Sequence, residues 1–509
     1  MGSGNAVDWF IDRHVAAGDG ARLAFRDPWR SLTYQDLLTD TRRFASALSR
    51  AGIGRERRMV LLLQDTIDFP IAFWGTMRAG AVPVPINTLL TPETVAYILG
   101  DCRAAAVVMS AGLMGSLGDV VRALGVPVVV SQPDGMDVAD GFSALLSGGD
   151  PETETAAASP DEVAFWLYSS GSTGAPKGVR HIHSSLRFTA ETYGAQVLGI
   201  GPDDVMFSAA KAFHAYGLGN SLTFPMSVGA ATVFLPDRPT PDAVLGMMRT
   251  HNPTLFGGVP TLYAGLLANP YIGPGAGSSR LRRCISAGEA LPADIGSRWK
   301  SVVGVDILDG IGSTEMLHIF ISNNPDDIRY GSSGKPVPGY NARIVDEHDR
   351  PVPHGEAGEL VVRGDSAAEG YWNQRAKTRR TFQGEWIYTG DTYTRDAEGY
   401  FRFQGRSDEM LKVSGVWVSP FEVEEALISH PSVLEAAVIG HQDRDGLVKP
   451  KAFVILRDGD WDAAALVTEL QAHVKDRVGV WKYPRWIEFV ESLPKTATGK
   501  IQRFRLREV

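Results

Sequence analysis

The most constraining feature of the sequence is a short apolar stretch, residues 163–167, that runs directly into a loop rich in glycine and hydroxyl residues, residues 168–178. The apolar stretch is typical of a buried strand. The glycines of the loop permit positive φ and let the backbone approach a ligand closely. Such a loop exposes backbone N–H groups to an anion, hydroxyls add neutral donors, and Lys177 adds a positive charge. The sequence therefore predicts a phosphate-binding loop that follows a strand.

Two other interpretations of this loop are weaker. A run of small residues can be a flexible linker, but a lysine and a proline fixed between glycines directly after a buried strand argue against that interpretation. The phosphate loop of kinases and GTPases needs Gly-x-x-x-x-Gly-Lys-Ser/Thr. Here Gly178 follows Lys177, so the kinase spacing is absent.

The segment resembles the phosphate loop of the adenylate-forming enzymes, a superfamily that comprises acyl-CoA synthetases, adenylation domains and luciferases. The motif of that superfamily is Ser-Gly-Ser/Thr-Thr-Gly-x-Pro-Lys-Gly. The resemblance implies that the loop holds the β- and γ-phosphates of ATP. The loop residues that it assigns to ATP binding are Ser169, Ser170, Gly171, Ser172, Thr173, Gly174 and Lys177.

Composition limits the class of protein. The chain has 509 residues, 44% of them apolar and 21% charged, and is long enough for several hydrophobic cores. A formal net charge of −9 argues against nucleic acid as a main partner, although a local basic patch can still bind the phosphates of CoA. We find neither an apolar run long enough for a membrane span nor a signal peptide. Two cysteines are too few for a disulfide framework, so we expect a cytoplasmic protein.

The distribution of apolar residues predicts an α/β fold for the first part of the chain. Helical stretches such as 34–51 and 92–101 alternate with short apolar runs such as 59–63 and 128–130. This alternation indicates mostly parallel sheets with helices on both faces. We therefore expect a large N-terminal domain of layered βα units.

After about residue 335 the pattern changes to short strands and turns. Strands at 342–345, 358–362 and 400–403 predict an antiparallel β subdomain. The last hundred residues, with helices at 420–429 and 462–478 and strands at 436–439 and 452–456, predict a small mobile α+β domain. We place the division at Asp408, with an N-terminal domain of residues 1–407 that binds nucleotide and acid, and a C-terminal lid domain of residues 408–509.

Further motifs of the same superfamily follow in its usual order. Residues 311–315 resemble the motif in which a threonine contacts the α-phosphate and a glutamate helps to hold Mg²⁺, which assigns catalytic roles to Thr314 and Glu315 and a metal-binding role to Glu315. A carboxylate beside phosphates binds magnesium readily. Ile311 stands where the motif has an aromatic residue, so an aliphatic side chain is expected to contact the adenine.

Other segments complete the implied nucleotide site. Asp391, in a Thr-Gly-Asp sequence, is implied to accept hydrogen bonds from both ribose hydroxyls. Arg406 is implied to contact the nucleotide, and residues 286–290 to line the adenine pocket. The further residues assigned to ATP binding are Gly288, Glu289, Ala290, Asp309, Gly310 and Ile311.

Two C-terminal segments resemble the moving parts of the superfamily. Residues 405–415 imply a hinge at Asp408 and a tunnel for the pantetheine of CoA, with Lys412, Ser414 and Gly415 as its tunnel residues. Residues 494–501 resemble the C-terminal loop, in which Lys500 occupies the position of the catalytic lysine. A lysine between the substrate carboxylate and the α-phosphate stabilises charge during in-line attack.

The resemblance implies two half-reactions: a carboxylate and ATP form acyl-AMP and pyrophosphate, and a thiol then displaces AMP. Residues 213–220 and 309–320 resemble the benzoate–CoA ligase branch, which implies benzoate or a small hydroxy-, amino- or halo-benzoate as the acid. His214 stands where this branch typically has phenylalanine. The implied lining of the acid pocket is Ala215, Tyr216, Gly217, Gly310, Ile311 and His318.

Three functions stay open at this point. The first is an aryl-CoA ligase that uses ATP, CoA and Mg²⁺, as a monomer or a homodimer. The second is a stand-alone adenylation enzyme that loads the aryl group onto the phosphopantetheine of a carrier protein. The third, a catalytically silent nucleotide-binding protein, is disfavoured because every expected catalytic position is filled. A metal site at His181 and His183 is also disfavoured, since no third ligand follows in a suitable pattern.

Overall fold

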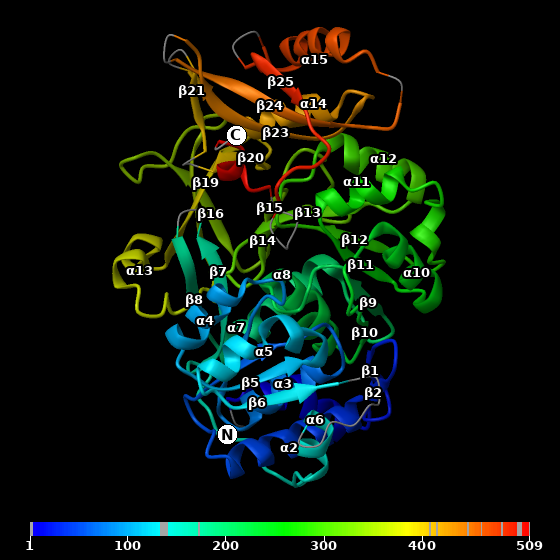
Figure 1. Cartoon of the computed structure of the whole chain (residues 1–509), viewed down its shortest axis with the longest axis vertical. Coiled ribbons are helices and arrows are strands. Elements are labelled where there is room, and N and C mark those ends of the chain that lie inside the picture. The colour runs from blue at the N-terminus through cyan, green and yellow to red at the C-terminus, as the bar shows by residue number, and fades with distance from the viewer. Residues whose placement is uncertain are drawn as a thin grey trace.

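The structure is a computed structural model that describes residues 4–132, 141–171, 174–406, 409–413, 416–444, 447–459, 461–479, 482–495 and 501–507. The molecule is elongated, with the N-terminal elements at one end and the C-terminal α+β unit at the other (Figure 1). This layout confirms the predicted α/β fold. Within the described residues, no helix combines the length and apolar character that a bilayer span requires.

The largest sheet has nine strands in the order β15-β14-β13-β12-β11-β9-β10-β1-β2. Its central strands pair in parallel, while β2, β14 and β15 pair antiparallel at the two edges. The strands are β1 (Leu23–Arg26), β2 (Ser31–Thr33), β9 (Val205–Ser208), β10 (Ala231–Val233), β11 (Leu255–Gly258), β12 (Arg283–Ser286), β13 (Ile307–Gly312), β14 (Ile319–Ser322) and β15 (Lys335–Pro336).

Three helices cover one side of this sheet, at the right of Figure 1. They are α10 (Pro241–His251), α11 (Pro260–Ala268) and α12 (Ala293–Val303). Phe256, Tyr263 and Trp299 pack together in the core between these helices and the strands. Short helical turns connect the remaining parts of this region: η1 (Asp8–Asp12), α1 (Arg13–Ala16), α7 (His183–Thr189), η3 (Ala190–Leu198), α8 (Ala215–Leu218), η4 (Gly219–Thr223), α9 (Phe224–Met226) and η5 (Pro274–Gly277).

A second sheet, β4-β3-β5-β6, is parallel throughout. Its strands are β3 (Arg58–Leu62), β4 (Val82–Pro85), β5 (Ala104–Ser110) and β6 (Val128–Ser131), and its neighbouring helices are α2 (Tyr34–Arg50), α3 (Asp68–Arg78), α4 (Pro92–Asp101), η2 (Ala111–Leu113), α5 (Met114–Ala123) and α6 (Phe142–Ser147). Helices α2 and α4 confirm the predicted stretches. Thr33 caps α2 in a capping box with Asp36, and Thr91 caps α4.

The predicted phosphate loop differs from expectation in one respect. It is the end of a long hairpin formed by β7 (Val163–Gly171) and β8 (Gly174–Ile182), not a loop that begins at residue 168. Ser169 pairs with Lys177 and Gly171 with Gly174. Backbone groups make the ladder, so serines and glycines continue the strands even though their side chains carry no strand signal. Ser172 and Thr173 lie outside the described residues.

The antiparallel subdomain is also confirmed. It contains β16 (Asn341–Val345), β17 (Gly358–Arg363), α13 (Arg375–Thr381), β18 (Phe382–Gln383), β19 (Trp386–Arg395) and β20 (Phe401–Arg406).

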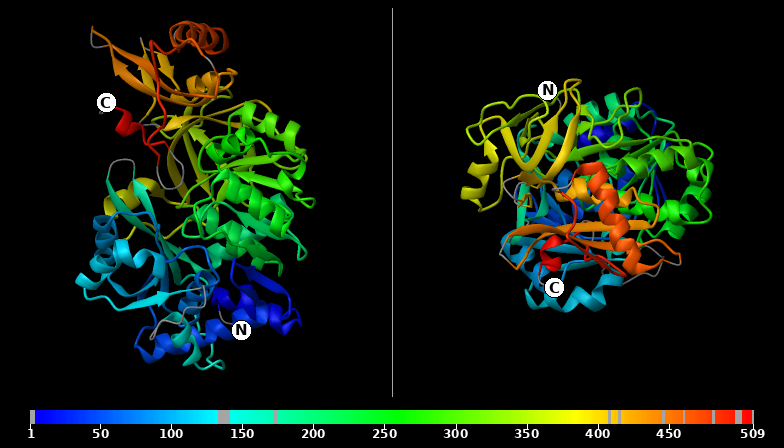
Figure 2. Two further views of the ribbon diagram at one scale, coloured as in Figure 1. Left: turned by 45° about the vertical axis from the view of Figure 1, so that its right-hand side comes forward. Right: turned by 90° about the horizontal axis from the view of Figure 1, so that it is seen from above.

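The C-terminal unit has a hydrophobic core of its own, which includes Val423, Leu427, Val438 and Leu470. Its elements are β21 (Leu411–Val413), β22 (Val416–Val418), α14 (Pro420–Ile428), β23 (Val433–Gln442), β24 (Val448–Leu456), α15 (Ala463–Val478), β25 (Trp486–Phe489) and α16 (Arg503–Leu506). Figure 2 shows the last segment turning back from this unit toward the N-terminal part. Asp408 lies outside the described residues, so the division at this position stays a prediction.

Candidate active site

Three polar side chains from distant parts of the chain meet beside the phosphate hairpin. Lys177 lies on β8, Glu315 in the turn after β13, and Tyr371 just before α13. The Lys177 ammonium lies 3.3 Å from Oε1 of Glu315 and donates to the Tyr371 hydroxyl at 2.8 Å. The hydroxyl donates in turn to the same Glu315 oxygen at 2.7 Å. A cation, a hydroxyl and a carboxylate thus form a closed triangle where the phosphates are predicted to bind.

Glu315 stays ionised although its side chain is only 15% exposed. Burial alone would raise its pKa, but the Lys177 ammonium and the hydrogen bond from Tyr371 outweigh burial and lower it. An ionised carboxylate is a ligand that Mg²⁺ prefers. The donor chemistry of Glu315 therefore fits the predicted metal-binding role.

The hydroxyl of Ser169 supplies a further group on the hairpin. Its oxygen is buried and has no hydrogen-bond partner among the described residues. An unpartnered buried hydroxyl is costly unless a ligand or water satisfies it. Because Ser169 pairs with Lys177 across the hairpin, its hydroxyl fits the predicted contact with a phosphate.

The turn after β13 joins the phosphate site to the acid pocket. Leu317 adopts a left-handed conformation with φ of 66°, which is rare for a residue with a branched side chain. This conformation lets Glu315 face Lys177 while His318, three residues later, faces Tyr216. His181 holds the same turn, because its Nε2 donates to the carbonyl oxygen of Thr314 at 2.8 Å.

The predicted acid-pocket residues Tyr216 and His318 are in contact. Nε2 of His318 lies 3.2 Å from the carbonyl oxygen of Tyr216, and the two rings are 5.6 Å apart. The Tyr216 hydroxyl lies 3.0 Å from the carbonyl oxygens of both Gly258 and Ile285, on neighbouring strands of the large sheet. Aromatic rings surround His318, and burial lowers its pKa to about 3. His318 is therefore a neutral imidazole packed among aromatic rings.

Glycines make this packing possible. A Cβ atom at Gly219 would lie 2.3 Å from the His318 ring, and one at Gly217 would lie 2.0 Å from the carbonyl oxygen of Lys211. Ala215 is buried beside them at the start of α8. Gly310 and Ile311 lie on β13, which pairs with β14 just after His318. His214 precedes α8 and packs edge-on against Phe213, with ring centroids 4.6 Å apart.

The predicted nucleotide residues occupy two places. Asp391 and Arg406 face each other across β19 and β20 and form an ion pair at 2.9 Å. Asp309 lies on β13, inside the large sheet, where its Oδ2 accepts from the backbone N–H of Leu291 at 3.3 Å. Its Oδ1 is buried without a hydrogen-bond partner among the described residues. Position 288 requires glycine because its φ is +94°, a backbone conformation that other residues rarely adopt.

The C-terminal tail reaches the predicted adenine segment. The backbone N–H of Ile501 donates to Oε1 of Glu289 at 3.0 Å, and Ile501 also bridges to Lys495. Lys500 itself lies outside the described residues. Its neighbour in sequence is nevertheless in contact with a residue assigned to ATP binding.

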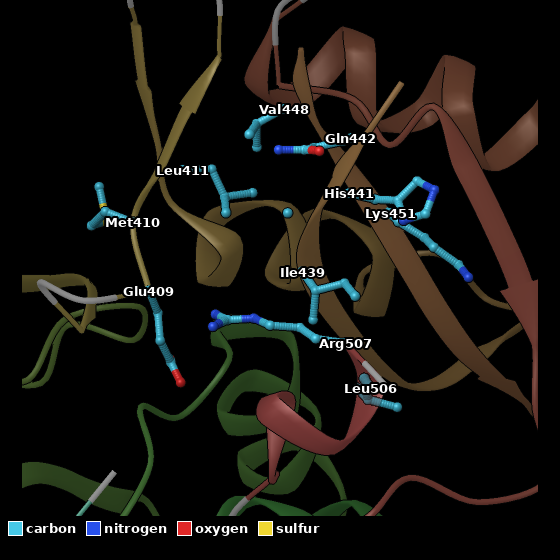
Figure 3. A pocket seen from close by; sticks show the side chains of 11 residues that line it. Glu409, Met410, Leu411, Ile439, His441, Gln442, Val448, Lys451, Leu506 and Arg507 are labelled. Carbon is cyan, nitrogen blue, oxygen red and sulfur yellow. The ribbon is translucent and has the colours of Figure 1, made fainter. Parts of the chain in front are cut away.

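A groove of about 450 Å³ opens in the C-terminal unit (Figure 3). Its lining combines the stretch after the predicted hinge, strands β23 and β24, and the C-terminal tail. Arg507 extends across the groove toward Glu409, while His441 and Lys451 lie on the opposite wall. Of the predicted tunnel residues, Lys412 lies on β21 next to this groove, and Ser414 and Gly415 lie outside the described residues.

Sequence reasoning missed Tyr371. The pair His181 and His183, at which a metal site was disfavoured, contacts backbone groups. Nε2 of His181 donates to a backbone carbonyl, and Nδ1 of His183 accepts from the backbone N–H of Ala6 at 3.2 Å. Burial lowers the pKa of each to about 4, so both rings are neutral. The one signal for Tyr371 was its position in a glycine-aromatic stretch, 370–372, which by itself is typical of core.

Comparison with known proteins decides the family. The AMP-binding enzyme family matches residues 12–372, and its C-terminal domain matches residues 422–500. The chain belongs to the AMP-binding enzyme family. This agrees with the order of motifs and with the phosphate hairpin described above.

Members of this family with benzoate in their names are similar over the full length. The chain is 52% identical to a benzoate–CoA ligase of Thauera aromatica, over 99% of this chain and 95% of that protein. It is 49% identical to a 4-hydroxybenzoate–CoA/benzoate–CoA ligase of Rhodopseudomonas palustris, over 99% and 94%. The crystal structure of a benzoate CoA ligase from Burkholderia xenovorans LB400 superimposes with a TM-score of 0.93 at 48% identity, over 99% of both chains. The resemblance to the benzoate–CoA ligase branch is therefore confirmed.

Proposed function

We propose that the chain activates benzoate, or a small substituted benzoate, with ATP to give aryl-AMP and pyrophosphate, and then transfers the aryl group to CoA with release of AMP. The main support for this proposal is that one turn of the chain contacts both the phosphate hairpin and the aromatic residues of the predicted acid pocket. Residues 313–318 present Glu315 to the phosphate hairpin and His318 to an aromatic pocket. A carboxylate on a ring held in that pocket can meet the α-phosphate of a nucleotide held on the hairpin.

In the first half-reaction a carboxylate oxygen attacks the α-phosphorus of ATP and pyrophosphate leaves. Ser169 and Lys177 hold the β- and γ-phosphates, and the hydroxyl of Thr314 contacts the α-phosphate. Mg²⁺ at Glu315 would offset the charge that builds up on the departing pyrophosphate. Lys500 stabilises charge between the carboxylate and the α-phosphate. The contact between Ile501 and Glu289 supports its place at the nucleotide.

The nucleoside is held by the remaining residues. Asp391 accepts from the ribose hydroxyls, with Arg406 beside it. The unpartnered Oδ1 of Asp309 suits the amino group of adenine. Ile311 supplies an aliphatic contact for the adenine ring. These groups orient ATP so that the pyrophosphate faces Lys177 and the α-phosphate faces the acid.

In the second half-reaction the thiol of CoA attacks the acyl carbon and AMP leaves with the oxygen that linked it to the acyl group. We propose that the lid domain turns about Asp408 and brings the segment with Lys412, Ser414 and Gly415 to the pantetheine. The groove beside this segment carries the cations Arg507 and Lys451 and the imidazole of His441. It is our candidate for contact with the phosphates of CoA.

The pocket favours an uncharged aromatic ring. His318 is neutral, and the surrounding rings provide apolar contact.

A cytoplasmic location also stays our proposal, supported by two buried cysteines that form no disulfide.

A panel assay tests the proposed function. The protein is mixed with Mg²⁺, ATP and one of benzoate, hydroxybenzoates, aminobenzoates or short aliphatic acids, and pyrophosphate release is measured. CoA and a separately purified phosphopantetheinylated carrier protein are then offered in turn. We expect pyrophosphate release with benzoate and thioester formation with CoA. Thioester on the carrier alone would identify the stand-alone adenylation enzyme, and no release with any aryl acid would contradict the proposal.

A further inference from the structure

Tyr371 lies between the two charged groups of the phosphate site. Its hydroxyl accepts from Lys177 at 2.8 Å and donates to Glu315 at 2.7 Å. The Lys177 nitrogen also lies 4.0 Å from the centroid of the Tyr371 ring, within the range of a cation–π interaction. The residue is only 4% exposed. Both the ring and the hydroxyl of this tyrosine therefore hold the ammonium group.

The backbone around Tyr371 joins the two halves of the phosphate site. In residues 368–372, the bridging segment, the N–H groups of Trp372 and Glu369 donate to carbonyl oxygens of β8 at 2.8 and 2.9 Å. At the other end, the N–H of Ala368 donates to the carbonyl oxygen of Glu315 at 2.8 Å. The bridging segment thus connects the hairpin that carries Lys177 to the turn that carries Glu315.

A glycine fixes the direction of the Tyr371 side chain. Gly370 has φ of +115°, and a Cβ atom there would lie 2.6 Å from Thr378. The hydroxyl of Thr378 accepts from the backbone N–H of Tyr371 at 3.1 Å. These contacts leave the tyrosine little freedom to turn away from Lys177 and Glu315.

We propose that Tyr371 is a positioning residue that keeps Lys177 and Glu315 apart and ready for Mg²⁺ and the phosphates of ATP. The inference rests on the proposed function and deepens it. Without the hydroxyl, the 3.3 Å separation can close to the 2.7–2.9 Å of a charge-assisted hydrogen bond. The lysine and the carboxylate would then satisfy each other, and the ligand would have to break a stronger ion pair.

The test uses Tyr371→Phe, which removes the hydroxyl and keeps the ring. Titration calorimetry measures binding of MgATP without any acid, so that no reaction occurs. We expect Kd to rise about tenfold, the factor equivalent to the loss of about 1.4 kcal/mol of binding free energy. The KM for MgATP should rise in parallel, while the KM for benzoate and the rate of thiolysis of supplied benzoyl-AMP should stay within about twofold.

Tyr34→Phe is the matched control. Tyr34 is buried and donates one hydrogen bond, to the carbonyl oxygen of Ala230 at 2.9 Å, away from the phosphate site. It should leave MgATP binding unchanged. In a double-mutant cycle, Tyr371→Phe should have little further effect on MgATP binding in a Glu315→Gln background, because its partner is already neutral.

Two results would overturn the inference. One is an unchanged Kd for MgATP in Tyr371→Phe. The other is an equal loss in binding, adenylation and thiolysis together with a lower Tm, which marks a purely structural role. A wild-type protein that acts on no aryl acid would overturn the proposed function instead, and the calorimetric test of Tyr371 would still apply.

Discussion

Burial of His318 makes the folding stability of the protein depend on pH. Its pKa is about 3 in the folded protein, whereas a histidine in an unfolded chain titrates near 6.5. Below pH 6.5 the unfolded chain binds a proton at this histidine, whereas the folded protein does not. The free energy of unfolding therefore falls as the pH falls. The stabilisation is fully present above about pH 7 and is lost progressively toward pH 3. Between pH 8 and pH 5 this one side chain accounts for about 2 kcal/mol.

The substitution His318→Gln tests this value. Glutamine keeps an N–H donor for the carbonyl oxygen of Tyr216 but does not titrate. Urea unfolding, followed by the fluorescence of the 11 tryptophans, gives the free energy of unfolding at pH 8, 7, 6 and 5. We expect the wild type to lose about 2 kcal/mol more than the variant between pH 8 and pH 5.

His348→Gln serves as the control, because the His348 side chain is 64% exposed. Its stability should follow the wild-type curve at every pH. Parallel curves for wild type and His318→Gln would show that the histidine titrates in the folded pocket, and would refute a neutral imidazole beside the acid.

Four further predictions concern the two half-reactions and the pocket. Lys500→Ala should lower the rate of aryl-AMP formation by about 10²- to 10³-fold and leave thiolysis of supplied aryl-AMP largely intact; an equal loss in both would contradict its role. Asp408→Pro should impair the CoA step more than pyrophosphate release, because proline fixes φ at the hinge; normal CoA transfer would count against rotation there. Gly219→Ala should raise the KM for benzoate and cost about 1–3 kcal/mol of stability through the clash with the pocket histidine, while Gly246→Ala, with open space around it, should do neither. Arg507→Gln should raise the KM for CoA about two- to fivefold at an unchanged KM for ATP, and an unchanged KM for CoA would remove the groove from the CoA site.

Much of the fold follows from local patterns. The capped, amphipathic stretch at α2 and the apolar run at β3 are visible without any tertiary information. The order of strands is not, because pairing depends on contacts far apart in sequence. Strand β11, for example, lies next to β9 rather than next to β10. The length of the two strands in the phosphate hairpin was also underestimated, because backbone pairing of serine and glycine leaves no hydrophobic pattern.

The sequence identified the charged residues of the candidate site, but it did not predict how they are arranged. Motifs named Lys177 and Glu315 separately, and only the folded chain shows that they form a mostly buried ion pair. Tyr371 was missed because an aromatic residue within a partly apolar stretch usually belongs to the core. Its role depends on a hydrogen bond to a residue 56 positions away, and a sequence pattern does not report such a contact.

We propose that the acid is activated as an aryl-adenylate before the thiol attacks. Benzoate labelled with ¹⁸O in its carboxyl group tests this directly, with ATP, Mg²⁺ and CoA present and the AMP product analysed by mass spectrometry. If the carboxylate attacks the α-phosphorus, one ¹⁸O atom passes to each AMP formed. Unlabelled AMP, or label in pyrophosphate or phosphate, would contradict an aryl-AMP intermediate.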